Sequence, residues 1–83
     1  SVRVAVVEQG YGLEQLVNDR DNFVRAAVAS QGYKLEKLVD DSSSKVRAVV
    51  ASKGYGLDKL ANDENEFVKD TVADFYKSAN NIS

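Results

Sequence analysis

The 83-residue chain contains no cysteine, histidine, methionine, tryptophan or proline. Without cysteine it can form no disulfide bond, no thiolate metal site and no cysteine nucleophile. Without histidine the commonest zinc ligand is missing, and so is the most frequent general base of enzymes. The acidic segments also lack the ligand spacing of a calcium-binding loop. We therefore expect no enzyme activity, no metal site and no cofactor in this chain.

Long apolar stretches and an excess of basic charge are missing as well. No apolar run approaches the ~20 residues that a membrane-spanning helix needs. The net charge is −2 and the pI is about 5.0, which argues against the phosphate backbone of a nucleic acid as the partner. We expect neither a membrane nor a nucleic acid to be bound.

The main feature that is present is a repeat of 22 residues. Segments 2–23, 24–45 and 46–67 align without gaps, neighbouring copies match at 12 of 22 positions, and eight positions are the same in all three. A shorter segment, 68–79, matches only the beginning of a unit before it diverges. A fixed period of this size is typical of stacked repeats, in which each unit is stabilised by its neighbours. We predict a single repeat domain with a C-terminal cap over 68–79.

The middle unit predicts two helices. Apolar positions from 24 to 28 follow the spacing of one helical face, and Gly32 follows where a residue with positive φ commonly ends a helix. The next apolar stripe, from 35 to 39, predicts a second helix that is too short to be stable alone. The expected core consists of these two stripes and their equivalents one period away: Val24, Ala27, Val28, Leu35, Leu38 and Val39.

The competing interpretation is a β-solenoid. Segment 2–7, VRVAVV, alternates like a strand, and 22 residues fall within the range of leucine-rich repeats. The corresponding segments 24–29 and 46–51 replace the alternation with alanine, however, and the Leu-x-Leu of a leucine-rich strand is missing. These copies favour helices, and we predict an all-α fold.

The motif Val-Arg-x-Ala-Val-Ala at 24–29, followed by Leu-x-x-Leu, resembles the bacterial leucine-rich repeat variant family and, more distantly, HEAT and armadillo repeats. The similarity covers about 67 of the 83 residues. The present unit is shorter than that family's, a Gly-Tyr pair replaces its Asn-Pro-x-Thr turn, and its N-terminal cysteine cluster has no counterpart. The resemblance implies a right-handed α-solenoid of two-helix units, with a C-terminal capping helix, that acts as an interaction scaffold.

One basic residue recurs in every unit: Arg3, Arg25 and Arg47, with Lys69 in the same position of the last segment. This arginine ladder can bind phosphates or an acidic partner. Alternatively, it can pair with a ladder of aspartates, each six residues before the next basic residue: Asp19, Asp41 and Asp63. Such pairs would tie each loop to the following helix and add modest stability. We favour this structural role, because periodic aspartates would screen the arginines from a polyanion.

Aromatic residues form two further sets. Tyr11, Tyr33 and Tyr55 recur once per unit; they can anchor a peptide or stack on bases, or pack on the leucines of their own unit, which we favour. Phe23 and Phe67, with Lys45 at the position between them, are irregular. Specificity is expected at irregular positions, because the shared ones build the stack. These phenylalanines are candidate partner contacts, or they pack against the neighbouring loop.

The sequence therefore predicts a non-enzymatic protein–protein interaction scaffold. Two alternatives remain open: nucleic-acid or phosphate binding through the arginine ladder, and a regulatory terminal segment of a larger enzyme. Because the chain begins within a unit and without Met, we expect a fragment or processed form, for which the lack of a signal peptide is uninformative. We expect a cytoplasmic location. The candidate partner-binding residues are Phe23, Phe67, Tyr11, Tyr33, Tyr55, Arg3, Arg25 and Arg47.

Overall fold

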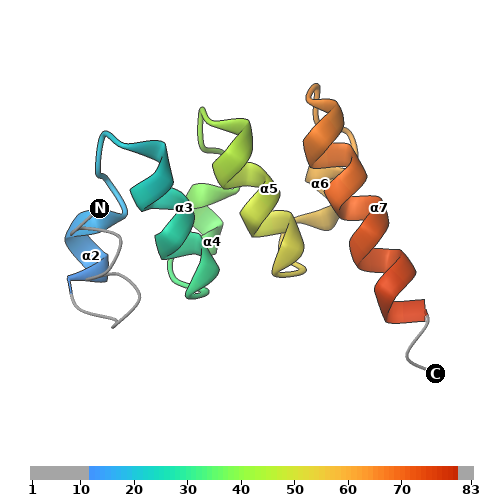
Figure 1. Ribbon diagram of the computed structural model, residues 1–83, viewed down its shortest axis with the longest axis horizontal. Coiled ribbons are helices and arrows are strands. Elements are labelled where there is room, and N and C mark those ends of the chain that lie inside the picture. Colours follow the sequence, from blue (N-terminus) through green and yellow to red (C-terminus); the bar gives the residue numbers. More distant parts are fainter. Residues whose placement is uncertain (1–11, 81–83) are drawn as a thin grey trace.

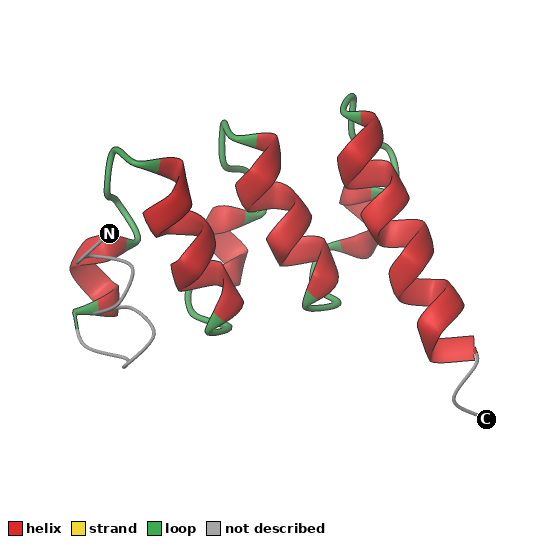
Figure 2. Cartoon of the chain, viewed as in Figure 1, coloured by secondary structure: helices red, strands yellow, loops and turns green. Residues whose placement is uncertain are grey.

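The computed structural model describes residues 12–80, the last of these in its backbone only (Figure 1). Helices and turns make up this range, and none of its residues lies in a strand (Figure 2). The predicted all-α class is thus confirmed, and strands are excluded for segments 24–29 and 46–51; segment 2–7 lies outside the described residues. The helices are α2 (Leu13–Leu16), α3 (Asn22–Ser30), α4 (Leu35–Leu38), α5 (Ser44–Ser52), α6 (Leu57–Leu60) and α7 (Glu66–Asn80).

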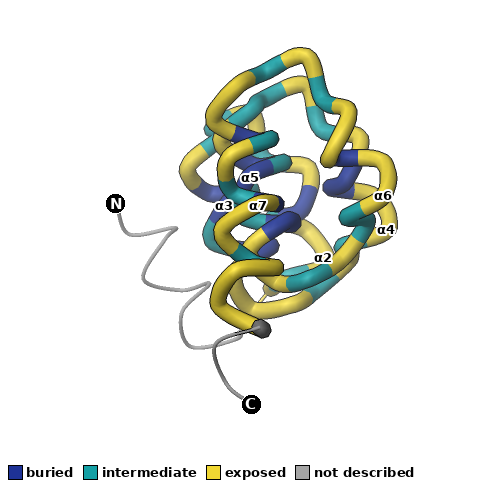
Figure 3. The backbone as a smooth tube through the Cα atoms, turned by 90° about the vertical axis from the view of Figure 1, so that its right-hand side faces the viewer, coloured by how far each residue is buried: buried dark blue, intermediate teal, exposed yellow. Residues whose placement is uncertain are grey.

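The helices form two layers (Figures 1 and 3). The long helices α3, α5 and α7 lie side by side in one layer, and the short helices α2, α4 and α6 lie in the other. Each long helix packs on the next one in the chain, and each short helix packs on the long helices before and after it in the described range. Among the helices of residues 12–80, none has both the length and the apolar character needed to cross a membrane.

The core lies between these two layers. Side chains from α3 and α5 with no exposed surface occupy its centre, and a leucine from each of α4 and α6 closes it from the other side. Burying a Val or Leu side chain contributes about 1.5–3 kcal/mol, so this apolar interior is the main source of stability. The largest fully buried side chains are Leu38, Leu60, Val24, Val28, Val46, Val50 and, from α7, Val68.

The prediction of the buried face was partly wrong. Ala27 and Leu35 are only partly buried, whereas Ala26 and Ala29, which the prediction left out, are buried. A long helix packs on another long helix and also on short helices, so its buried arc is wider than the single stripe that a periodic pattern reveals. Small alanine side chains at the extra positions let neighbouring helices approach closely.

The ends of the long helices follow the sequence signals. The Asp21 carboxylate accepts a hydrogen bond from the Phe23 backbone N–H at 2.8 Å, and the Asn65 side chain does the same for Phe67 at 2.9 Å, as expected of helix N-caps. Ser43 occupies the N-cap position of α5, but its side chain makes no capping hydrogen bond; its hydroxyl accepts from the Asn22 side chain at 3.0 Å. This bond joins the starts of two neighbouring long helices.

The last helix, α7, differs from the others on its outer side. Val68 and Val72 are buried, as are the equivalent valines of α3 and α5. At the position where α3 and α5 carry the buried residues Ala26 and Ala48, however, α7 carries the exposed Asp70. This position, which is covered in α3 and α5, is therefore polar and open in α7.

Candidate interaction surface

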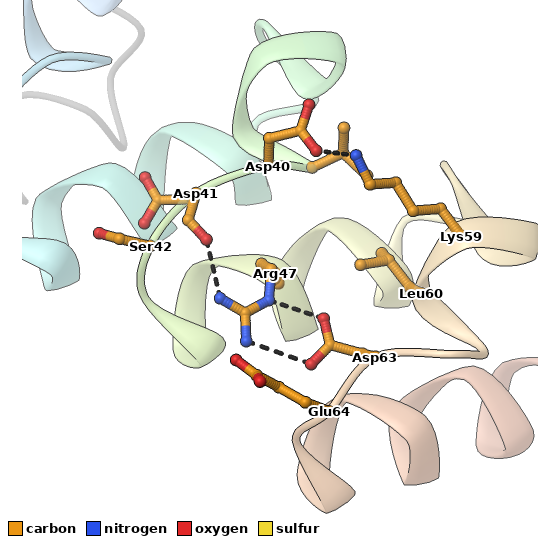
Figure 4. Close-up of a pocket in the computed structure, with 9 residues that line it drawn as sticks. Asp40, Asp41, Ser42, Arg47, Lys59, Leu60, Asp63 and Glu64 are labelled. Carbon is orange, nitrogen blue, oxygen red and sulfur yellow. Dashed lines mark hydrogen bonds and ion pairs between the residues drawn. The ribbon is translucent and has the colours of Figure 1, made fainter.

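The arginine ladder is engaged inside the protein, along the edge formed by the interhelical loops. We call this region the loop edge and define it by its charged residues: Asp19, Arg25, Asp41, Arg47 and Asp63. Arg47 donates from Nε and Nη2 to the two carboxylate oxygens of Asp63, at 2.7 and 3.1 Å (Figure 4). It also donates from Nη1 to the backbone carbonyl of Asp41 at 2.8 Å. One guanidinium thus binds both the loop before its own helix and the loop before the next long helix.

Arg25 repeats this arrangement one unit earlier. It donates to the Asp41 carboxylate at 2.7 and 3.0 Å and to the backbone carbonyl of Asp19 at 2.8 Å. The prediction was right in part. The aspartate six residues before each arginine ties its loop to the following helix, but through its backbone carbonyl, and the carboxylate comes from the aspartate sixteen residues after the arginine. The guanidinium carries donors on two sides in a planar fork, so it can bind both loops at once, whereas the prediction considered only one.

These pairs are sheltered and strengthened by their surroundings. The side chains of Arg47 and Asp63 are only 14 and 9% exposed. The hydrogen bonds that Arg47 donates to Asp63, outweighing the effect of burial, raise the pKa of Arg47. The same bonds lower the pKa of Asp63, and the Asn65 backbone N–H, which donates to the same carboxylate at 2.8 Å, lowers it further. The charges of the loop edge are thus satisfied within the protein.

The arginine ladder is interrupted at α7, the last described helix. Lys69 replaces arginine in α7, and its ammonium group pairs at 2.9 Å with Glu66 on the same helix. This hydrogen bond raises the pKa of Lys69. No loop with a matching aspartate follows α7 in the described residues, so the two-sided contact of Arg25 and Arg47 has no counterpart here.

A cavity of about 500 Å³ opens beside Arg47 (Figure 4). Its walls mix acidic and basic side chains that pair with one another: Arg47 with Asp63, and Lys59 with Asp40. Among residues 12–80 there is no cluster of three or more side chains that could hold a metal ion. Asp41 pairs with Arg25 as well, so Glu64 is the one charged side chain of the lining without a hydrogen bond or ion pair among residues 12–80.

The predicted tyrosine ladder does not have one uniform environment. Tyr33 is partly buried against the core, with the Lys34 ammonium 5.8 Å from the centre of its ring. Tyr55, one period later, is 40% exposed. Tyr11, like Arg3, lies outside the described residues. Packing on the protein's own core, the role we favoured, fits Tyr33 better than Tyr55.

The irregular phenylalanines are exposed on one side of the long helices. Phe23 and Phe67 are 59 and 63% exposed, near the starts of α3 and α7. Lys45 occupies the same position of α5, and its ammonium lies 4.9 Å from the centre of the Phe23 ring. Residues four and seven positions further along each helix share this side. We call this surface the outer face: Phe23, Ala27 and Ser30 on α3; Lys45, Val49 and Ser52 on α5; and Phe67 and Thr71 on α7.

The polar atoms of the outer face are largely satisfied within their own helices. The hydroxyls of Ser30 and Ser52 donate to the carbonyls of Ala27 and Val49, both at 2.6 Å. The Thr71 hydroxyl donates to the Phe67 carbonyl at 2.8 Å. With these donors occupied, the middle of the outer face behaves as an apolar surface, apart from the ammonium group of Lys45.

The outer face is hollowed between α5 and α7. A groove of about 230 Å³ is lined by Lys45, Ala48, Val49, Ser52, Phe67 and Thr71. A second hollow of about 290 Å³ continues it, and its lining residues are Ser52, Thr71, Asp74, Phe75 and Ser78. The two hollows share Ser52 and Thr71, so they form one groove that runs along the helices; we call it the α5–α7 groove. From the sequence we singled out Phe67 and noted Lys45 but did not predict the groove. The available signal was Val49, a larger apolar residue where the preceding unit has alanine.

The site divides into a loop edge whose charges are paired and an outer face whose phenylalanines and Lys45 remain accessible. The loop edge is built from charged residues that recur in every unit, whereas the outer face carries Phe23, Lys45 and Phe67 at a position that differs between units. No family model, curated protein or solved structure matches this chain.

Proposed function

We propose that the chain is a non-enzymatic protein–protein interaction scaffold, built as a right-handed α-solenoid of 22-residue two-helix units with α7 as the capping helix. The spacing of the helices supports this architecture: α3 and α5 begin 22 residues apart, and so do α4 and α6. Asp70 supports the role of α7, because an exposed charge at the position of the packed alanines disfavours a further helix. The resemblance to the leucine-rich repeat variant family agrees with both.

One observation carries the functional proposal: two phenylalanines more than half exposed on the same face of the stack. Exposed aromatic side chains beside an apolar groove are typical of surfaces that bind other proteins. Their exposure also distinguishes them from the residues that build the core. Phe23 and Phe67 are therefore the proposed anchors of the interface.

The arrangement of charges weighs against phosphate or nucleic-acid binding through the arginine ladder. Arg25 and Arg47 each already make two bonds to a carboxylate and one to a carbonyl. A polyanion would have to compete with these sheltered aspartates and would also meet their negative charge. No described residue bears on the other alternative, a regulatory segment of a larger enzyme.

The proposal can be tested by capturing proteins from a lysate of the source cells on the immobilised chain, followed by titration of each purified candidate. The wild-type chain should retain a protein that the double variant Phe23→Ser/Phe67→Ser does not. Tyr55→Ser, which changes an exposed aromatic residue away from the outer face, serves as the control and should bind as the wild type does. Equal retention by the double variant, or salt-sensitive binding of polyphosphate in place of any protein, would contradict the proposal.

A further inference from the structure

The middle of the α5–α7 groove is apolar, whereas each of its two halves carries a charged side chain. Ala48, Val49 and Phe67 form apolar walls, and the hydroxyls of Ser52 and Thr71 in its centre donate to carbonyls of their own helices. No donor in the centre therefore requires a polar partner, and an apolar side chain can fill it without leaving a hydrogen bond unmade.

The two halves of the groove carry opposite charges. Lys45 lines the half near the helix starts, and Asp74 lines the other half, about one turn before Ser78. Within residues 12–80, the side chains of Lys45 and Asp74 take part in no ion pair or hydrogen bond; the contact recorded for Lys45 is with the Phe23 ring. This differs from the loop edge, where Arg25 and Arg47 are matched to carboxylates. The two groove charges are therefore available to a bound molecule.

The spacing of the charges fits a helix. Asp74 lies seven residues beyond Phe67, which occupies the same position of α7 as Lys45 does of α5. At 1.5 Å per residue, seven residues correspond to about 10 Å along the helix, or two turns. A partner helix lying in the groove meets both charges when it carries an acidic and a basic residue about seven positions apart.

We propose that the α5–α7 groove binds an amphipathic helix of a partner protein, an inference that rests on the proposed function. Its apolar side chains enter the groove, its acidic residue pairs with Lys45, and its basic residue pairs with Asp74. Recognition of this kind combines apolar anchors at helical spacing with charges that set the orientation.

A second copy of this chain fits the groove less well. A two-fold axis through the middle of the groove would set each Lys45 against the Asp74 of the other copy, but it would also set groove against groove. Both hollows would then stay unfilled, and the close packing of an interface would be lost. A separate helix, which can enter the groove, is therefore the better occupant.

The test is a selection of random 16-residue peptides displayed on phage, carried out in parallel on the wild-type chain and on Lys45→Glu. We expect the wild type to enrich peptides in which apolar residues separate an acidic from a basic residue. Lys45→Glu should enrich peptides with a basic residue at the acidic position. A selected peptide, titrated against the purified chain, should bind roughly tenfold more weakly to Lys45→Glu and to Phe67→Ala.

Lys53→Glu is the matched control, because it makes the same change of charge at an exposed lysine that follows the other end of α5 and does not line the groove. It should bind the peptide as the wild type does, and circular dichroism should show that all variants are folded. Selection of no peptide, or of peptides without the acidic residue, would overturn the inference, as would equal binding to Lys45→Glu. Peptides that bind equally well to Phe23→Ser/Phe67→Ser would also overturn it, yet would leave a scaffold function standing with its site elsewhere.

Discussion

The loop edge and the outer face use similar residues in opposite ways. At the loop edge, Arg47 makes three hydrogen bonds, and its side chain is only 14% exposed. On the outer face, Lys45 pairs with no carboxylate in the described residues and lies over an exposed phenylalanine ring. The two residues are only two positions apart in α5, so their different roles arise from the side of the helix on which they lie.

This difference separates the residues that build the stack from those left for recognition. Arg25 and Arg47 occupy a position that is the same in each unit, where a loop on either side supplies a carbonyl and a carboxylate. Lys45 and Phe67 occupy a position that varies between units and faces no neighbouring loop. A periodic residue thus indicates a contact between units, and a departure from the period marks the surface on which specificity can arise.

The largest effect is expected from Val28→Asp, which should abolish the difference between the two regions by unfolding both. Val28 has no exposed surface, and an unpaired charge in the core costs several kcal/mol, comparable with the whole stability of a small domain. Circular dichroism should show loss of the helical signal. Ala27→Asp, at the partly buried neighbouring position, is the control and should remain helical; a cooperative melt of Val28→Asp near the wild-type midpoint would contradict the description of the core.

A smaller effect, confined to the loop edge, is expected from Arg47→Ala. Losing the bidentate bond and the carbonyl bond, and leaving a sheltered carboxylate unpaired, should lower the free energy of unfolding by about 2 kcal/mol. Lys45→Ala, two residues away on the outer face, should change it by less than about 0.5 kcal/mol. Urea denaturation of both variants measures the difference, and equal losses would show that the two regions do not differ in this way.

Lowering the pH should weaken the Arg47–Asp63 pair at the loop edge and so lower the free energy of unfolding. The bond from Arg47 holds the pKa of Asp63 below its ordinary value of 3.8, so the folded state favours the ionised carboxylate. The resulting stability is fully present above the ordinary pKa and is lost as the pH falls through the lowered one. Urea denaturation between pH 7 and 2 should show this loss in the wild type and a smaller loss in Asp63→Asn. Parallel pH profiles would mean that the pair does not contribute.

The smallest effect on stability is expected from Phe67→Ala. The side chain is 63% exposed, so its removal should change the free energy of unfolding by less than about 0.5 kcal/mol, while partner binding is lost. Thermal melts measure the first quantity and titration with the captured partner measures the second. A large loss of stability would indicate that Phe67 supports the fold, as the loop-packing interpretation of the sequence suggested.

Much of the fold could be predicted from the sequence, because the information is local. Gly32 and Gly54 end the long helices with φ of 77 and 78°, as the glycine positions indicated, and the leucine pairs form short helices. The buried positions were harder to predict, because residues 26 and 27 are both alanine. Only the neighbouring helix decides which of the two alanines is covered.

The pairing at the loop edge and the α5–α7 groove depend on three-dimensional arrangement. Asp41 lies near two arginines in the sequence, six residues before Arg47 and sixteen after Arg25, and the pattern alone favoured the closer one. The structure uses both contacts, one through the carbonyl and one through the carboxylate. Likewise, Lys45 and Asp74 belong to different units, and only the packing of α5 on α7 places them in the two halves of one groove.

The central claim is that the periodic charges tie neighbouring units together and leave the outer face for recognition. A double-mutant cycle of Arg47→Ala and Asp63→Ala, with stability measured by urea denaturation, tests it most directly. A coupling energy of about 1.5 kcal/mol between the two residues is expected, because they form a sheltered bidentate pair. A coupling energy within a few tenths of a kcal/mol of zero would contradict the claim and would return the arginine ladder to the list of candidate binding residues.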